Sequence, residues 1–208
     1  MFTIKKKHQV AVLVSAIALS LTGCGGDDDA APSDVRTAAS GELFNDADVE
    51  FATAMIPHHA QALEMVDLTV GRDLSPEVQA LAAQIREAQA PEVEQMTDWL
   101  TAWDEPVPET SLNHVNGDDD GHGMEGMDDL DEMPGMMSAD EMDALEAASG
   151  ADFEPMFLEM MVEHHQGAVE MAETEQSDGE YADAVKLAEA IETSQTTEIE
   201  TMEGLLGS

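Results

Sequence analysis

Residues 55–65 read MIPHHAQALEM and residues 161–171 read MVEHHQGAVEM, so two adjacent histidines stand between two methionines twice in the chain. The two stretches align at a constant offset of 106 residues. The same offset aligns a later pair of segments, matching Leu81, Ile85, Gln89, Glu92, Met96 and Leu100 with Leu187, Ile191, Gln195, Glu198, Met202 and Leu206. Self-similarity at one fixed spacing indicates a duplicated structural unit.

Each copy of the unit is predicted to form two helices. At 100° per residue, an arc of roughly 120° on the first helix collects an apolar face that includes both histidines. Its members are Phe51, Met55, His58, His59, Ala62, Met65 and Val66. The second helix is predicted to begin at Ser75, because this N-cap residue is followed by Pro76 and the acidic Glu77. Two such hairpins, each with a narrow apolar stripe, predict an all-α fold in which they pack as a four-helix bundle.

Two prolines interrupt the helical pattern of the first copy only. Pro57 and Pro91 lie inside its predicted helices, whereas Glu163 and Thr197 stand at the matching positions of the second copy. An interior proline removes a backbone hydrogen bond and crowds the preceding turn. We therefore expect kinks in the first two helices alone.

The N-terminal part of the chain is predicted to direct export. Residues 1–23 combine a basic start with an apolar stretch too short to span a bilayer, which is typical of a secretory signal peptide. The stretch LTGC ending at Cys24 looks like a bacterial lipobox, so Cys24 is the predicted lipidation site; a free cysteine in the core is the alternative. Residues 24–42 are expected to be a flexible acidic tether.

The predicted helical domain, residues 43–206, divides into three parts. Its first half is 43–103, its second half is 151–206, and an acidic crossover rich in Met and His, 104–150, joins them. The crossover has little that can form a core and is expected to be a long loop with a short helix from Ser138 to Ala148.

The charge excludes several classes of partner. The chain has 46 acidic residues against 7 Lys and Arg, a formal net charge of −39. Nucleic acids and anionic lipid headgroups would repel such a protein, so we expect no nucleic-acid partner. Cys24 is the only cysteine, which leaves no disulfide and no thiolate ligand in the domain.

The histidine pairs predict a site for a soft metal ion. Burying an imidazole or carboxamide without a partner costs perhaps 1 to 3 kcal/mol, so polar groups on both core stripes must bond one another or bind something. Di-iron bundles place Glu three residues before the ligand His, but here those positions hold Met55 and Met161. Thioether and imidazole together suit copper, especially Cu(I), better than zinc or iron.

The candidate metal ligands are Met55, His58, His59, Met65, Met161, His164, His165 and Met171. Further ligands, or groups that position the ligands, are Gln89, Glu92, Met96, Gln195, Glu198 and Met202. A weak copper collector in the crossover would consist of His114, His122, Met124, Met127, Met133, Met136 and Met137; a plain acidic linker is the alternative. Buried methionines are also common core fillers.

With its two His-His motifs, each followed by Gln-x-x-Glu-x-x-x-Met, the chain resembles the bacterial secreted family known as domain of unknown function 305. The resemblance covers about Leu43 to Leu206 apart from the crossover. It implies a ferritin-like four-helix fold, an exported location and, for some members, copper binding or tolerance. Pro57 fits the family's usual Met-x-Pro-His-His form, whereas Glu163 departs from it.

These patterns lead to one main functional hypothesis and two alternatives. The main hypothesis is a lipid-anchored extracytoplasmic protein, at a cell surface or in a periplasm, that sequesters copper or hands it to an unidentified transfer partner. The first alternative is a ferritin-like metallo-oxidase or other redox enzyme, although no nucleophile-base pair or Glu-x-x-His motif supports it. The second is a structural bundle without metal, whose histidines bond to the Gln and Glu residues of the neighbouring helices.

Overall fold

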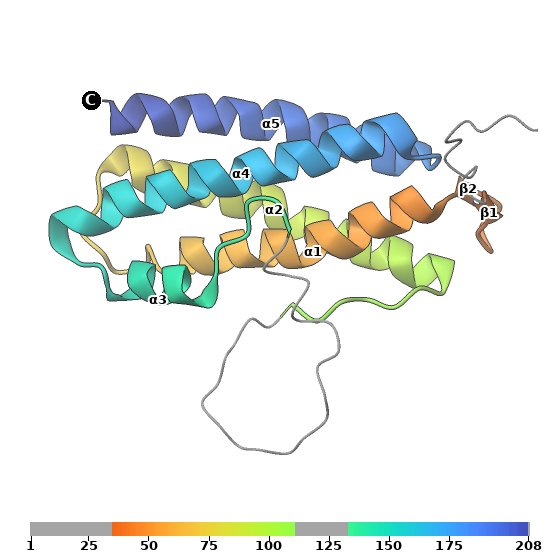
Figure 1. Ribbon diagram of the computed structural model, residues 1–208, viewed down its shortest axis with the longest axis horizontal. Helices are drawn as coiled ribbons and strands as arrows, with labels where there is room; N and C mark the ends of the chain where they lie inside the picture. Colours follow the sequence, from red (N-terminus) through yellow and green to blue (C-terminus); the bar gives the residue numbers. More distant parts are fainter. Residues whose placement is uncertain (1–34, 111–132, 208) are drawn as a thin grey trace, which may run out of the picture. The chain divides into compact units, whose positions relative to one another are not determined.

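The computed structural model describes residues 35–110 and 133–207. These residues form five α-helices, a short 3-10 turn and a two-stranded sheet (Figure 1), so the expected, predominantly helical fold is confirmed. The elements in chain order are β1 (Arg36–Thr37), β2 (Leu43–Phe44), α1 (Asp46–Asp67), α2 (Pro76–Trp103), α3 (Ala139–Ala147), η2 (Gly150–Asp152), α4 (Phe153–Asp178) and α5 (Ala182–Leu206). The predicted signal peptide and Cys24 lie outside the described residues.

The helix starts follow the capping residues of the sequence. Ser75 caps α2 by accepting from the Val78 N–H, and Pro76 occupies the first turn, as predicted. Ser138 caps α3 and forms a reciprocal capping box with Glu141, which confirms the short helix expected in the crossover.

The two interior prolines do not break their helices. α1 runs without interruption through Pro57, and α2 does the same through Pro91, so neither helix is split. The expected kinks stay a prediction. A proline removes a single backbone hydrogen bond. Pro57 is itself buried between the fully buried Ile56 and His58, and packing on both sides of it holds the chain in the helical path.

A small hairpin precedes α1, and its first strand and turn lie in residues 24–42, which were expected to be tether. Its strands pair antiparallel with Arg36 opposite Phe44, and Gly41 supplies the positive φ of 95° in the connecting turn. Phe44 is buried and stacks on Trp103 of α2 with ring centroids 4.7 Å apart. The ordered domain therefore starts several residues before Leu43, because the hairpin covers the end of the helical core.

The long helices α1, α2, α4 and α5 run alongside one another and share two apolar clusters. The hairpin-side cluster contains Phe44, Phe51, Met55, Ile56, Met96, Trp99, Leu100, Trp103, Tyr181, Leu187 and Ile191, together with buried alanines. The α3-side cluster contains Met65, Val66, Leu74, Val78, Leu81, Ile85, Met137, Leu145, Phe153, Phe157, Leu158, Met161 and Met202, with two further alanines.

A layer of buried polar side chains lies between the two clusters on every long helix. It consists of His58, His59 and Gln61 on α1, Gln89 on α2, His164 and His165 on α4, and Gln195 on α5, and we call it the polar layer. On α1, for example, the first cluster ends at Ile56 and the second begins at Ala62. The polar groups are thus enclosed by apolar side chains toward both ends of the helices.

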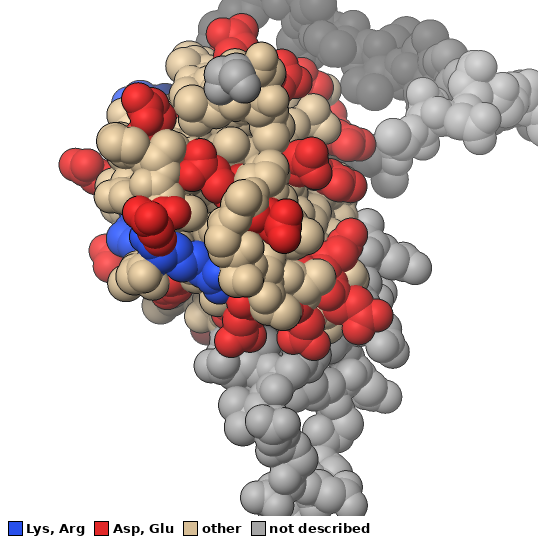
Figure 2. Space-filling view, turned by 90° about the vertical axis from the view of Figure 1, so that its left-hand side faces the viewer, with Lys and Arg blue, Asp and Glu red and all other residues tan. Residues whose placement is uncertain are grey.

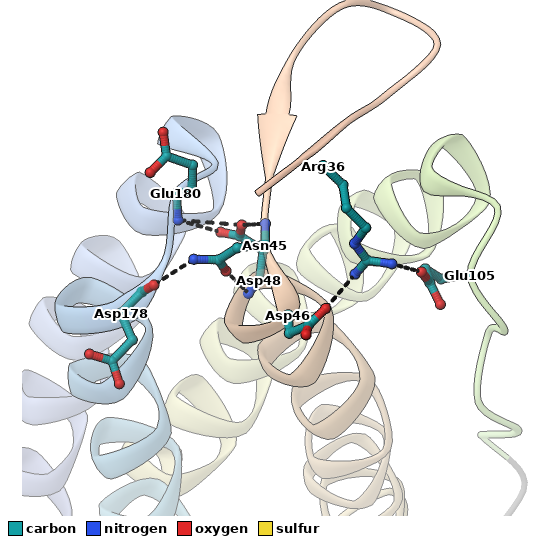
Figure 3. Close-up of polar contacts among 7 residues, drawn as sticks. All are labelled: Arg36, Asn45, Asp46, Asp48, Glu105, Asp178 and Glu180. Atoms are coloured by element: carbon teal, nitrogen blue, oxygen red, sulfur yellow. Dashed lines mark hydrogen bonds and ion pairs between the residues drawn. The ribbon is translucent and has the colours of Figure 1, made fainter. Parts of the chain in front are cut away.

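The hairpin end of the molecule is fastened by a buried carboxylate (Figure 3). Asp48, in the first turn of α1, accepts from the backbone N–H of Asn45 at 2.6 Å and of Tyr181 at 2.9 Å. The Asn45 side chain in turn donates to the Asp178 carbonyl at 2.7 Å. These bonds hold the start of α1 against the turn between α4 and α5, and so set the register of α1 against α4.

The surface agrees with the extreme charge of the sequence. On the face drawn in Figure 2, acidic side chains are spread widely, whereas Lys and Arg show only in small places on its left-hand side. In the described part of the chain, no helix is both long and apolar enough to cross a membrane.

Candidate metal centre

The structure brings the histidines of the two repeats together. The four imidazoles come from α1 and α4, and each of them is 0% exposed. The rings of His58 and His164 lie 3.8 Å apart between centroids, with a 40° angle between their planes. His164 and His165, which are adjacent in the chain, have centroids 6.4 Å apart. We call His58 and His164, whose rings contact each other across α1 and α4, the central pair.

Each repeat ties its second histidine to a glutamate of the following helix. The Nε2–H of His59 donates to Glu92 Oε2 at 2.7 Å, and the Nε2–H of His165 donates to Glu198 Oε2, also at 2.7 Å. A carboxylate can only accept, so in the neutral ring the proton sits on Nε2 and Nδ1 carries the lone pair. Both glutamate side chains are 16% exposed and lie at the edge of the polar layer.

The first histidine of the first repeat has a different partner. The Nε2 of His58 lies 3.1 Å from the carbonyl oxygen of Pro134, which belongs to the C-terminal part of the crossover. A carbonyl also only accepts, so this bond again leaves the lone pair on Nδ1. Adjacent histidines of one repeat thus face different neighbours, as expected from their separation of 100° on a helix.

Burial keeps the central histidines neutral. Desolvation, followed by repulsion from His59, lowers the pKa of His58 to about 3, although the bond to Pro134 opposes the shift. Desolvation, followed by repulsion from His58, also holds the pKa of His164 well below its usual range. A neutral imidazole offers a lone pair, so both rings are in the state that binds a cation.

Many polar atoms in this layer have no hydrogen-bond partner among the described residues. They are Nδ1 of His58, His59 and His165, both ring nitrogens of His164, and both amide atoms of Gln89 and Gln195. The purely structural alternative has the histidines bond to the Gln and Glu residues of the neighbouring helices. The two bonds to Glu92 and Glu198 are formed, but the bonds to Gln89 and Gln195 are not. Each unpartnered atom costs roughly 1 to 3 kcal/mol when it is buried without a partner. A cation that binds the lone pairs of the ring nitrogens would therefore stabilise the layer.

The methionines lie on both sides of the polar layer. Met55 and Met96 belong to the hairpin-side cluster, and Met65, Met161 and Met202 belong to the α3-side cluster; all five are 0% exposed. Met171 is half-buried against the hairpin-side cluster. Buried thioethers commonly fill a core, and all five of the fully buried ones lie in the two apolar clusters. Within residues 35–110 and 133–207, no three His, Cys, Asp or Glu side chains converge as a ready metal site.

The crossover contributes to the core in a way the sequence analysis did not anticipate. Met137 belongs to the crossover, which was expected to have little that can form a core, but it is 4% exposed and packs in the α3-side cluster, because the chain here lies against the helices. Met133 and Met136 are half-buried. The other collector candidates, His114, His122, Met124 and Met127, lie outside the described residues.

Three residues of the site were missed by sequence reasoning: Gln61, Pro134 and Gly167. Gln61 lies in the polar layer and bonds the crossover. One signal was present, because the 106-residue offset pairs Gln61 with Gly167, so that a polar side chain in one motif corresponds to no side chain in the other. A polar residue replaced by glycine on a buried face indicates that something other than a side chain fills one of the two positions.

The sequence and structure are similar to those of known bacterial proteins. Residues 48–206 match the sequence profile of the family described as "Domain of unknown function (DUF305)". A DUF305 fragment from Deinococcus radiodurans is 30% identical, with a TM-score of 0.65, over 83% of this chain and 99% of that one. A DUF305 protein from Streptomyces coelicolor, described as secreted, is 32% identical, with a TM-score of 0.63, over 77% of this chain and 91% of that one.

A third similar structure is that of CopM in a Cu(II)-bound form. It is 31% identical, with a TM-score of 0.59, over 77% of this chain and 95% of that one. CopM structures with Cu(I) and with silver also match. Among curated protein sequences, none matches the chain.

Proposed function

The chain belongs to the DUF305 family, and from this premise we propose that it is an exported protein that binds copper, with Cu(I) favoured, in the polar layer of its helical core. The four long helices would form a ferritin-like four-helix bundle built from the two repeats. The protein would sequester the ion or hand it to a transfer partner.

The observation that carries the proposal is the central pair, His58 and His164. Their rings lie 3.8 Å apart, fully buried, and each has a ring nitrogen without a partner. Burial lowers both pKa values, so proton uptake cannot relieve the unsatisfied nitrogens near neutral pH. A monovalent soft cation can satisfy several lone pairs at once, and it carries less charge into a low-dielectric core than a divalent ion.

The remaining groups support the choice of copper. Methionine sulfur prefers Cu(I) over zinc, calcium or magnesium, and no thiolate is available in the domain to compete. The copper- and silver-bound forms of the similar CopM agree with a soft ion. The proposed ligands are Met55, His58, His59, Met65, Met161, His164, His165 and Met171, with Gln89, Glu92, Met96, Gln195, Glu198 and Met202 as additional or positioning groups.

The two glutamates would orient their histidines. Histidines that bind metals usually donate the other ring N–H to a carboxylate or a carbonyl, which fixes the ring and strengthens its lone pair. Glu92 and Glu198 hold His59 and His165 in this way, each through Nε2. The copper would then be bound through Nδ1.

The proposal extends to location and to the parts outside the described residues. Residues 1–23 would be a signal peptide, Cys24 the lipid attachment site, and the segment between Cys24 and the hairpin the remaining part of the tether predicted over 24–42. The domain would then lie outside the cytoplasm on a membrane. The similar Streptomyces protein, described as secreted, supports export. His114, His122, Met124 and Met127 would collect copper weakly.

A competitive titration with a Cu(I) chelator tests the proposal. The double variant His58→Leu with His164→Leu is expected to weaken binding at least tenfold, because both central rings are lost while the volume of the core is kept. Ile191→Leu, also buried but in the hairpin-side cluster, serves as the matched control. Circular dichroism checks folding, and unchanged Cu(I) affinity in a folded double variant would overturn the copper centre.

A further inference from the structure

A short piece of the crossover lies directly on the polar layer. We call residues Met133–Met137 the strap. Gln61 forms a reciprocal pair with it, since its amide donates to the Met137 carbonyl at 2.7 Å and its oxygen accepts from the Met137 N–H at 2.8 Å. Pro134 accepts from His58 in the same strap. The strap is therefore bonded to two polar-layer side chains of α1, His58 and Gln61.

The strap also requires a glycine on α4, at a position where any side chain would collide with it. A Cβ placed on Gly167 would lie 2.0 Å from the Pro134 carbonyl oxygen, and one on Gly135 would lie 2.6 Å from the backbone oxygen of Glu163. Gly135 has a positive φ of 73°, which favours glycine as well. The backbone of the strap thus contacts the backbone of α4, and no other residue fits at Gly167 without moving it.

The residues that hold the strap occupy equivalent positions of the repeat. Gln61 and Gly167 are separated by the same 106 residues that relate His58 to His164. The strap lies between these two positions. It is hydrogen-bonded to the side chain of Gln61, and it fits against α4 because Gly167 has no side chain. It thereby distinguishes the central histidines, because His58 is bonded to the strap through Nε2, whereas His164 has no bond to the strap within the described residues.

We propose that the strap is a working part of the metal centre, with Gln61 and Gly167 as positioning residues. The Pro134 carbonyl does for His58 what Glu92 does for His59 and Glu198 for His165: it holds the proton on Nε2 and leaves the buried Nδ1 for the cation. The inference rests on the proposed function, since it names how that site is oriented. Strap docking and copper binding must then strengthen each other by the same factor.

The opposite arrangement makes a different prediction. If copper were bound through Nε2 of His58, the Pro134 carbonyl would compete with the ion, and loading would release the strap. The bond geometry favours cooperation, because three histidines share one pattern in which Nε2 meets an oxygen acceptor and Nδ1 is buried without a partner. The two arrangements differ in the sign of the coupling, which is measurable.

The variant Gly167→Ala tests the strap with little effect on the helix. Alanine favours a helix more than glycine does, so α4 is not weakened, but its Cβ collides with Pro134. Gly204→Ala on α5 is the matched control, because nothing lies within 4 Å of a Cβ there. We expect Gly167→Ala to weaken Cu(I) binding about tenfold or more, and Gly204→Ala to leave it unchanged. Gln61→Leu, which removes the bonds to Met137, should act in the same direction.

Two readouts separate this inference from the proposed function. Imidazole ¹⁵N shifts of the metal-free protein should show His58 with its proton on Nε2, and a mixture of tautomers in Gly167→Ala. Limited proteolysis at the strap should slow when Cu(I) is added to the unmodified chain. Binding of Cu(I) with equal affinity by the unmodified chain and both strap variants, tighter binding by Gly167→Ala, or a His58 proton on Nδ1 would each overturn the inference while leaving the copper site intact. No Cu(I) binding by the unmodified chain would overturn both.

Discussion

The Nε2–H of His59 donates to the Glu92 carboxylate over 2.7 Å, and the second repeat forms the same bond at the same distance between His165 and Glu198. The sequence around these bonds has diverged, with Pro57 and Pro91 in one repeat replaced by Glu163 and Thr197 in the other. The geometry of the pair has therefore been kept while the neighbouring helix positions changed. Because the two His–Glu bonds are equivalent, changes to either one are expected to have similar effects on copper binding.

Replacing either glutamate by glutamine should weaken copper binding by about 10- to 100-fold. Glutamine keeps the size of the side chain, but its neutral amide stabilises the Nε2–H of His59 or His165 less and can also present a donor. Since both bonds have the same length and the same exposure, Glu92→Gln and Glu198→Gln should have similar effects. Competitive Cu(I) titration of the two variants measures the loss of affinity in each and shows whether the two losses are similar.

The control for this pair is Glu94→Gln, an exposed residue on the same helix as Glu92. It removes one negative charge from the same region without touching a histidine. An equal loss of affinity in Glu94→Gln would mean that overall charge, and not the bond to His59, attracts the ion.

The thioethers next to the histidines should contribute selectivity. Met55→Leu combined with Met161→Leu keeps the core volume, so the free energy of unfolding should change by less than about 1.5 kcal/mol per site. Affinity for Cu(I) and Ag(I) should fall about tenfold, or roughly 1.4 kcal/mol, while Zn²⁺ binding should be unaffected because zinc gains little from sulfur of this kind. Met142→Leu, half-buried on α3, is the control, and equal losses for all three ions would contradict the role of the thioethers.

The parts of the fold that could be predicted from the sequence are those that depend on residues close together in the chain or on the internal repeat. Ser75 and Ser138 are N-cap residues, and each marks the start of a helix. The 3.6-residue period of the apolar residues places His58 and His164 on buried helix faces. The fixed offset between the repeats then implies that equivalent residues meet. These signals involve residues close in sequence, or copies of one another, and need no knowledge of the packing.

The strap and the N-terminal hairpin could not be predicted in this way. The strap binds through the Pro134 carbonyl and through the absence of a side chain at Gly167, neither of which has a periodic signature. The strands of the hairpin have only two residues each, too short for an alternating pattern. Met137 was misjudged for the same reason, because its burial depends on the strap being docked.

The buried carboxylate of Asp48 should be important for stability (Figure 3). It accepts backbone bonds from Asn45, Glu180 and Tyr181, so Asp48→Ala would strand donors at both the start of α1 and the turn before α5. We expect a loss of at least about 2 kcal/mol in the free energy of unfolding, measured by urea denaturation. Asp46→Ala is the control, since Asp46 is exposed and pairs with Arg36 at the surface, where the effect should stay below about 1 kcal/mol.

A neighbouring carboxyl should make stability depend on pH. Burial, followed by its hydrogen bond to Asp48 and the negative charge of Asp48, raises the pKa of Glu175 to about 9 from an ordinary value of 4.5. Glu175 is 1% exposed, and apart from its contact with Asp48 neither of its carboxyl oxygens has a hydrogen-bond partner among the described residues. The folded protein therefore keeps Glu175 protonated at neutral pH, whereas the unfolded chain ionises it.

The sign of the effect follows from proton uptake on folding. Between pH 4.5 and about 9 the unfolded state binds fewer protons at this site than the folded state, so the contribution of Glu175 to stability is greatest below pH 4.5 and falls as pH rises, by up to about 1.4 kcal/mol per pH unit. Glu175→Gln should remove this slope and stabilise the protein at pH 8. Glu173→Gln, exposed on the same helix, controls for the loss of one charge. Urea denaturation at pH 5, 6.5 and 8 measures all three proteins, and parallel curves for the unmodified chain and Glu175→Gln would show that Glu175 ionises normally.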